Sequence, residues 1–164
     1  MQSMKVLIAM ILFATICGCS QPKKETDQQQ ENEVRWMFWG ADWHPTKNQV
    51  VVGGSNDTFF KILSTKNFQE LKNYPYKGTI TNTIWHPSGN RLAISVQDGK
   101  SNSIILNIET DEMIALDSIT IEGARAIGWN QSGDLLAVGD NQGYLSFYDK
   151  NGKLLRKRDT NQKG

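Results

Sequence analysis

The two histidines of this chain are the first residues to consider for acid–base or metal chemistry. His44 and His86 are the only histidines among the 164 residues, and each sits in the tripeptide Trp-His-Pro. A metal site needs three or four ligands that converge in space, but no carboxylate stands at a fixed offset from either histidine. We therefore expect no catalytic, cofactor-binding or metal site at His44 and His86, and expect them to be structural.

The Trp-His-Pro tripeptide marks an internal repeat. The segments that begin at Trp43, Trp85 and Trp129 align without a gap, and the third copy carries Asn130 where the other two carry histidine. The tryptophans are 42 and 44 residues apart, which is a period typical of repeat architectures. We therefore treat Trp43, Trp85 and Trp129 as structural markers of the repeat.

Each copy is expected to form four short strands. The first strand ends at the tryptophan, a polar turn follows, and an apolar strand comes next, with Gly89 and Gly133 supplying a positive φ in two of the turns. Helical spacing of apolar residues is absent, so an all-β antiparallel fold is predicted. The strands expected after the tryptophans are 50–52, 59–63 and 68–72 in the first copy, 92–94, 104–108 and 113–116 in the second, and 135–138, 144–148 and 154–158 in the third.

This order of strands and turns resembles that of the WD-repeat (WD40-like) β-propeller family. The resemblance rests on the aromatic-x-Pro at the strand end, the Asn- or Asp-containing turns, and Phe147-Tyr148-Asp149 where the family often has Trp-Asp. It implies three four-stranded antiparallel blades in a folded region at 34–162, with blades at about 36–77, 78–121 and 122–162. It also implies that His44 and His86 are turn residues at the blade rim, and that radial repetition separates equivalent residues. The repeats are degenerate, because the terminal Trp-Asp and the Gly-His pair of the family are largely missing.

Three blades are fewer than a closed propeller has, since propellers usually have four to eight. Consecutive apolar residues at 50–52 and 135–138 predict burial on both faces of these strands, unlike a capping repeat. An incomplete or open ring is therefore expected. Gly164 stands where a fourth blade would begin, which leaves three hypotheses: a truncated copy of a longer propeller, a homodimer that closes a six-bladed ring, and a complementing chain of another kind.

The N-terminal segment has the features of an export signal. An apolar run of 11 residues, 6–16, is too short to cross a bilayer, which takes about 20. Ile16-Cys17-Gly18-Cys19 resembles the lipobox of bacterial lipoproteins, which implies a signal peptide at 1–18 and fatty acyl chains, palmitate among them, on Cys19. The polar run that follows Cys19 up to residue 33 is expected to be a disordered tether. The resemblance further implies a lipid-anchored protein of the bacterial cell envelope, at the outer membrane because Ser20 is not aspartate.

The function that these features favour is a non-catalytic scaffold for an unknown protein partner, held at the membrane by the lipid on Cys19. No repeated acid–base pair supports an enzyme, and 18 basic against 17 acidic residues favour no particular partner; nucleic acid is not expected outside the cytoplasm. The alternative is a module that binds carbohydrate or peptidoglycan through Trp36 or Trp39, unless the aromatic run 36–39 packs within the first blade. A basic patch (Lys150, Lys153, Arg156, Lys157 and Arg158) is either a solvated strand edge or a contact for anionic lipid headgroups.

Overall fold

The computed structural model describes residues 37–160, apart from 56–58, 98–101 and 121. These residues form twelve strands and no helix. The predicted signal peptide, Cys19, the tether, Trp36 and Gly164 lie outside the described residues. The strands are β1 (Met37–Trp43), β2 (Gln49–Ser55), β3 (Phe59–Ser64), β4 (Glu70–Pro75), β5 (Thr79–Trp85), β6 (Arg91–Gln97), β7 (Ile104–Asn107), β8 (Met113–Ala115), β9 (Ala124–Trp129), β10 (Leu135–Asp140), β11 (Tyr144–Asp149) and β12 (Leu154–Asp159).

The strands form three four-stranded antiparallel sheets in chain order, β1–β4, β5–β8 and β9–β12. Each sheet is a meander, because every strand pairs with its neighbour in the sequence. The first strand of each sheet ends at a repeat tryptophan, namely Trp43, Trp85 and Trp129. The prediction of three antiparallel four-stranded units in an all-β fold is confirmed.

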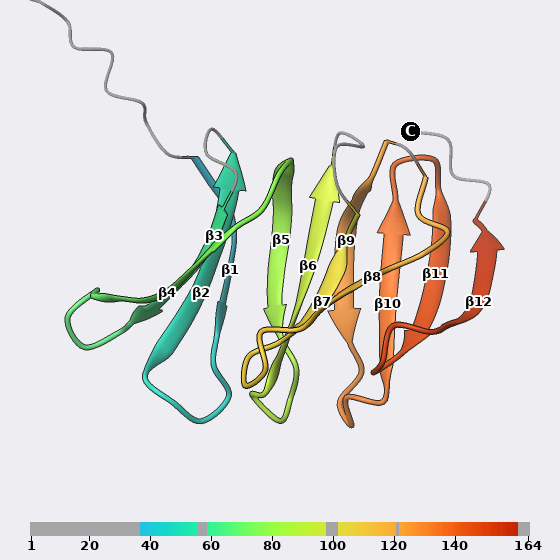
Figure 1. Ribbon diagram of the computed structural model, residues 1–164. Helices are drawn as coiled ribbons and strands as arrows, with labels where there is room; N and C mark the ends of the chain where they lie inside the picture. The colour runs from blue at the N-terminus through green and yellow to red at the C-terminus, as the bar shows by residue number, and fades with distance from the viewer. Residues whose placement is uncertain (1–36, 56–58, 98–101, 121, 161–164) are drawn as a thin grey trace, which may run out of the picture. The chain divides into compact units, whose positions relative to one another are not determined.

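The sheets stack face to face along the chain (Figure 1). Strands β1 and β2 pack on β5, and β5 and β6 pack on β9. The first strands therefore lie on the inside of the stack and β4, β8 and β12 on the outside. Among the described residues the three sheets do not close into a ring.

Two apolar layers hold the stack together, one between each pair of successive sheets. The first layer joins Val51, Phe60 and Ile62 of the first sheet to Leu92 and Ile94 of the second. The second layer joins the second sheet to the third. Burial of such side chains contributes about 1.5–3 kcal/mol each, so each sheet depends on its neighbour for stability. The second layer is built from Ala93, Ile105, Leu116, Ala124, Leu136, Val138 and Tyr148.

Each sheet has a leading face, toward the preceding sheet, and a trailing face, toward the following one. Residues paired across antiparallel strands share a face, so Val50 and its partner Leu63 lie on the leading face of the first sheet. Val50 and Val52 are only half-buried, and Leu135, on the trailing face of the third sheet, is 41% exposed. Among the described residues no sheet covers these two outer faces, so the burial of both faces that 50–52 and 135–138 predict is not reached there.

The fourth strand of the first sheet also differs from its prediction. It spans Glu70–Pro75 rather than 68–72. Phe68 takes a positive φ of 56°, which is unusual for a bulky side chain and belongs to a turn rather than a strand. The turn therefore displaces the start of the strand by two residues, and Phe68 is left 78% exposed.

Candidate functional site

The two repeat histidines join successive sheets. His44, at the end of β1, lies 3.1 Å through Nε2 from the carbonyl oxygen of Gly89 in the second sheet. His86, at the end of β5, makes the same contact with the carbonyl oxygen of Gly133 in the third sheet, at 2.9 Å. Both histidines are 6% exposed. They follow the last residues of β1 and β5, and they also bridge the junctions between sheets, a role that the sequence alone does not indicate.

The hydrogen bonds at the other ring nitrogen fix the role of His44. The backbone N–H groups of Thr46 and Lys47 both donate to Nδ1, at 3.1 and 3.0 Å. Nδ1 is therefore an acceptor, and Nε2 carries the proton that is donated to Gly89. Burial, and then the charge of Lys47, lower the pKa of His44, while the bond to Gly89 raises it. A neutral, buried imidazole with both nitrogens in use is suited to holding two sheets together rather than to proton transfer.

The turn glycines make room for these histidine rings. A Cβ on Gly89 would lie 2.4 Å from Cε1 of His44, and one on Gly133 would lie 2.2 Å from Nε2 of His86. Both glycines also have a positive φ, as predicted for the turns that contain them. The histidine and its glycine are 45 residues apart in the first pair and 47 in the second, so both contacts follow the repeat.

Each histidine ring also covers the tryptophan of the next repeat. The ring centroids of His44 and Trp85 are 4.5 Å apart, and those of His86 and Trp129 are 4.7 Å apart. Trp85 is 5% exposed, whereas Trp43, which no sheet precedes, is 69% exposed. The indole nitrogens of Trp85 and Trp129 are buried without a hydrogen-bond partner among the described residues. The tryptophans therefore act through ring packing rather than through their N–H groups.

A polar contact joins the outer parts of the first two sheets. Lys72 Nζ donates to a carboxylate oxygen of Asp111 at 2.7 Å, and to the carbonyl oxygen of Ile108 at 2.8 Å. The Tyr74 hydroxyl donates to the same carboxylate oxygen at 2.7 Å. Hydrogen bonds from Lys72 and then Tyr74 lower the pKa of Asp111, and the bond to Asp111 raises the pKa of Lys72. Asp111 is solvent-exposed, so this contact aligns the sheets more than it stabilises them.

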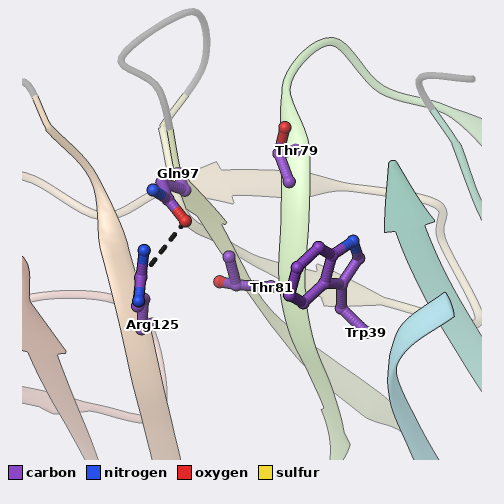
Figure 2. Close-up of a pocket in the computed structure, with 5 residues that line it drawn as sticks. All are labelled: Trp39, Thr79, Thr81, Gln97 and Arg125. Carbon is purple, nitrogen blue, oxygen red and sulfur yellow. Dashed lines mark hydrogen bonds between the residues drawn. The ribbon is translucent and has the colours of Figure 1, made fainter. Parts of the chain in front are cut away.

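A pocket opens where the inner strands of the three sheets approach one another. It has a volume of about 180 Å³ and is lined by Trp39 of β1, Thr79 and Thr81 of β5, Gln97 of β6 and Arg125 of β9 (Figure 2). The Trp39 ring lies on one side and the Arg125 guanidinium on the other (Figure 2). The pocket therefore combines an aromatic surface, hydroxyl and amide groups, and one cation.

Three of the lining residues occupy the same position of the repeat. Trp39, Thr81 and Arg125 each stand four residues before the tryptophan that ends their strand. The expectation that radial repetition separates equivalent residues is wrong here, because inner strands converge. Thr81 and Arg125 were not predicted as site residues. Their shared position, four residues before a repeat tryptophan, is the sequence signal that indicates them.

The pocket residues are held in place by bonds within the protein. The Trp39 indole N–H donates to the Ser55 hydroxyl at 3.0 Å, and Arg125 Nε donates to the Gln97 side-chain oxygen at 3.2 Å. Thr81 Oγ1 donates to the carbonyl oxygen of Ala124 at 2.7 Å, which links β5 to β9. The terminal amino groups of Arg125 take no part in these contacts. A guanidinium presented in this way suits a carboxylate, which it can bind through two parallel bonds.

The aromatic run at the start of β1 stays largely in solvent. Met37, Phe38 and Trp39 are 50%, 56% and 58% exposed. The run forms the first sheet's inner strand, as one alternative predicted, but its side chains are not packed away. In the basic patch, Lys157 donates to the carbonyl oxygen of Ser118, in the connection between β8 and β9, at 2.6 Å and lies over the ring of Tyr144 in β11.

The described part of the chain has no cluster of metal-ligating side chains and no membrane-spanning helix. Within it, no group of three or more histidine, cysteine, aspartate or glutamate side chains is placed to hold a metal ion. The same residues contain no helix of the length and apolarity needed to cross a bilayer.

The stacked four-stranded meanders with converging inner strands define the β-propeller class. The chain superimposes on the Cps50 (Swd1) β-propeller domain of Myceliophteria thermophila with a TM-score of 0.67 and 13% identity, over 77% of this chain and 42% of that one. No family profile matches the chain.

Two curated relatives resemble the chain in sequence. The chain is 28% identical over 118 residues to human Echinoderm microtubule-associated protein-like 2, and 26% identical over 134 residues to Eukaryotic translation initiation factor 3 subunit I of Candida albicans. These matches cover 71% and 73% of this chain but only 18% and 38% of the relatives. The chain is therefore similar to WD-repeat proteins, and its fold is that of WD40-like propeller blades.

Proposed function

We propose that the protein is a lipid-anchored, non-catalytic scaffold of the bacterial cell envelope that binds a partner protein at the Trp39–Arg125 pocket. The pocket carries this proposal, because it is built from one repeat position on three inner strands. Its aromatic ring and its guanidinium suit a peptide segment with an acidic side chain or a terminal carboxylate. The inter-sheet bonds of His44, His86 and Thr81 support it by keeping the lining residues in a fixed arrangement.

The pocket proposal predicts crosslinks that depend on Arg125. A photo-crosslinking amino acid at Thr79, on the pocket wall, is expected to capture a discrete partner in intact cells. Arg125→Glu should reduce that crosslink at least tenfold, because it places a negative charge against the acidic segment. The same amino acid at Glu109, on an exposed turn away from the pocket, is the control and should capture little. An equal yield of the Thr79 crosslink with and without Arg125→Glu would contradict the proposal that the partner binds at the pocket.

Carbohydrate binding is the second candidate function, because Trp39 presents an exposed ring beside the threonine hydroxyls and the Gln97 amide. Such a combination can stack on a sugar and bond its hydroxyls. Peptidoglycan fragments would then quench tryptophan fluorescence in the wild-type protein and not in Trp39→Phe, while the crosslink at Thr79 would capture no protein.

The lipid anchor is proposed from the lipobox-like Ile16-Cys17-Gly18-Cys19. Acyl chains on Cys19 would hold the domain at the membrane, since each buried CH₂ contributes about 0.8 kcal/mol and two or more chains anchor stably. Cys19→Ala is expected to abolish labelling by a palmitate analogue and to release the protein from the membrane fraction. Cys17→Ala is the matched control and should retain both. Labelling that survives Cys19→Ala would contradict the anchor and leave the pocket proposal untouched.

A further inference from the structure

The two outer faces of the stack carry the same kinds of residue as the faces that pack together inside it. On the leading face of the first sheet, Val50 and Val52 are half-buried, while their counterparts Leu92 and Ile94 in the second sheet are fully buried. On the trailing face of the third sheet, Phe147 is half-buried, while its counterpart Ile105 is fully buried. Each outer face is therefore an apolar blade face that no other sheet of the described residues covers.

At the turns that carry the His–Gly contacts, the two outer faces have residues of other sizes than the internal junctions. One outer face has a smaller side chain there and the other has a larger one. Inside, a bulky histidine on the trailing face meets a glycine on the leading face. Outside, the trailing face of the third sheet has the smaller Asn130 in place of histidine, and the leading face of the first sheet has the larger Lys47 in place of glycine. The larger side chain has thus moved from one face to the other. The Asn130 side-chain oxygen accepts from the backbone N–H of Leu135 at 3.0 Å, and its second lone pair is left for a donor such as the Lys47 amine.

The outer strands show a second pair of substitutions, in which an ion pair of the internal junction is replaced by an arginine on one outer face and an aromatic ring on the other. Lys72, paired with Ile62 on the trailing face, reaches Asp111 across the first junction. The position of Lys72 is taken in the third sheet by Arg156, which pairs with Phe147. The position of Asp111, a turn residue with φ of 57°, is taken in the first sheet by Phe68, with φ of 56°. An arginine and an exposed aromatic ring form a favourable cation–π pair, so this contact too suits these two faces.

We infer that the partner of the leading face of the first sheet is the trailing face of the third sheet of a second copy of this chain. Two copies then join head to tail through two identical junctions, each made by Trp43, Lys47 and Phe68 on one side and Asn130, Phe147 and Arg156 on the other. The described sheets of the two copies then number six, which lies within the four to eight blades that propellers usually have, and two-fold symmetry closes the ring. This inference stands apart from the pocket and the lipid anchor.

The test is a crosslink that only a head-to-tail arrangement permits. Full-length chains carrying Lys47→Cys with one epitope tag and Asn130→Cys with another are mixed and treated with a short bismaleimide. Covalent dimers are expected from the mixture, and each should bear both tags. Neither variant alone should give a covalent dimer, and nor should the parent chain, which controls for Cys17 and Cys19. Light scattering on the unmodified full-length chain, corrected for any detergent, should give twice the mass of one chain.

Three results would overturn the inference. The first is a mass of one chain at micromolar concentration with no mixed crosslink. The second is a crosslink within the Lys47→Cys chain alone, which would mean that like faces meet. The third is a ladder of increasing sizes, which would mean that the head-to-tail contact propagates without closing. Because neither substitution lies in the pocket or the lipobox, these results leave the proposed function unaffected.

Discussion

Replacing Gly123 with alanine is expected to lower the free energy of unfolding by about 3 kcal/mol, because two penalties combine at this residue. Gly123 has φ of 77°, which costs a residue with a Cβ about 1–2 kcal/mol. Its Cβ would lie 2.3 Å from the carbonyl oxygen of Val96 and 2.6 Å from Cα of Gln97. Both are backbone atoms, so the clash cannot be relieved by a side-chain rotation, and such overpacking costs about 1–3 kcal/mol.

The position of Gly123 makes the loss cooperative. It forms an isolated antiparallel bridge with Gln97 of the second sheet, and its carbonyl oxygen accepts from the backbone N–H of Asn141 at 3.0 Å. A shift at Gly123 therefore disturbs the junction of the second and third sheets rather than one loop. Chemical denaturation followed by circular dichroism measures the effect.

Gly128→Ala is the matched control for Gly123→Ala. Gly128 lies five residues further on in β9, and nothing comes within 4 Å of a Cβ added there. Its free energy of unfolding should change by no more than about 0.5 kcal/mol. Equal losses in the two variants would show that the third sheet is sensitive to any added methyl group, and that the contact with Val96 is not the cause.

Much of the fold could be predicted because local signals agree with the tertiary structure. The tryptophans end the inner strands, and the polar turns with Gly89 and Gly133 have the positive φ that their composition indicates. The fourth strand of the first sheet was misplaced because the turn runs through Phe68, a residue that propensity alone would place in a strand.

The contacts between sheets could not be derived in the same way. The bond from His44 to Gly89 depends on how far one sheet is rotated against the next, which no single repeat specifies.

The pocket could be predicted from the sequence in part. Aligning the repeats on their tryptophans brings Trp39, Thr81 and Arg125 into one column, but their closeness in space follows only from the convergence of the inner strands.

We expect the contribution of a repeat tryptophan to the free energy of unfolding to depend on which sheet of the stack carries it, and less on its position in the repeat. Trp85→Ala should lower the free energy of unfolding by about 3–5 kcal/mol, the range for removing a buried large aromatic. The Trp85 ring is 5% exposed, lies 4.5 Å from the ring of His44, and belongs to the apolar layer between the first two sheets. The substitution leaves a cavity at that junction, and denaturant unfolding at low protein concentration measures the loss.

Trp43→Ala, at the equivalent repeat position, should change the stability of the isolated chain by about 0.5 kcal/mol or less, because its ring is 69% exposed. Its effect should appear in association instead. If a second copy covers this face, Trp43→Ala shifts the dimer toward monomer, and the apparent stability of the wild-type protein rises with concentration while that of the variant does not. Comparable losses for Trp43→Ala and Trp85→Ala at every concentration would mean that the repeat position alone sets the contribution of the ring, and that the leading face of the first sheet is already covered within one chain.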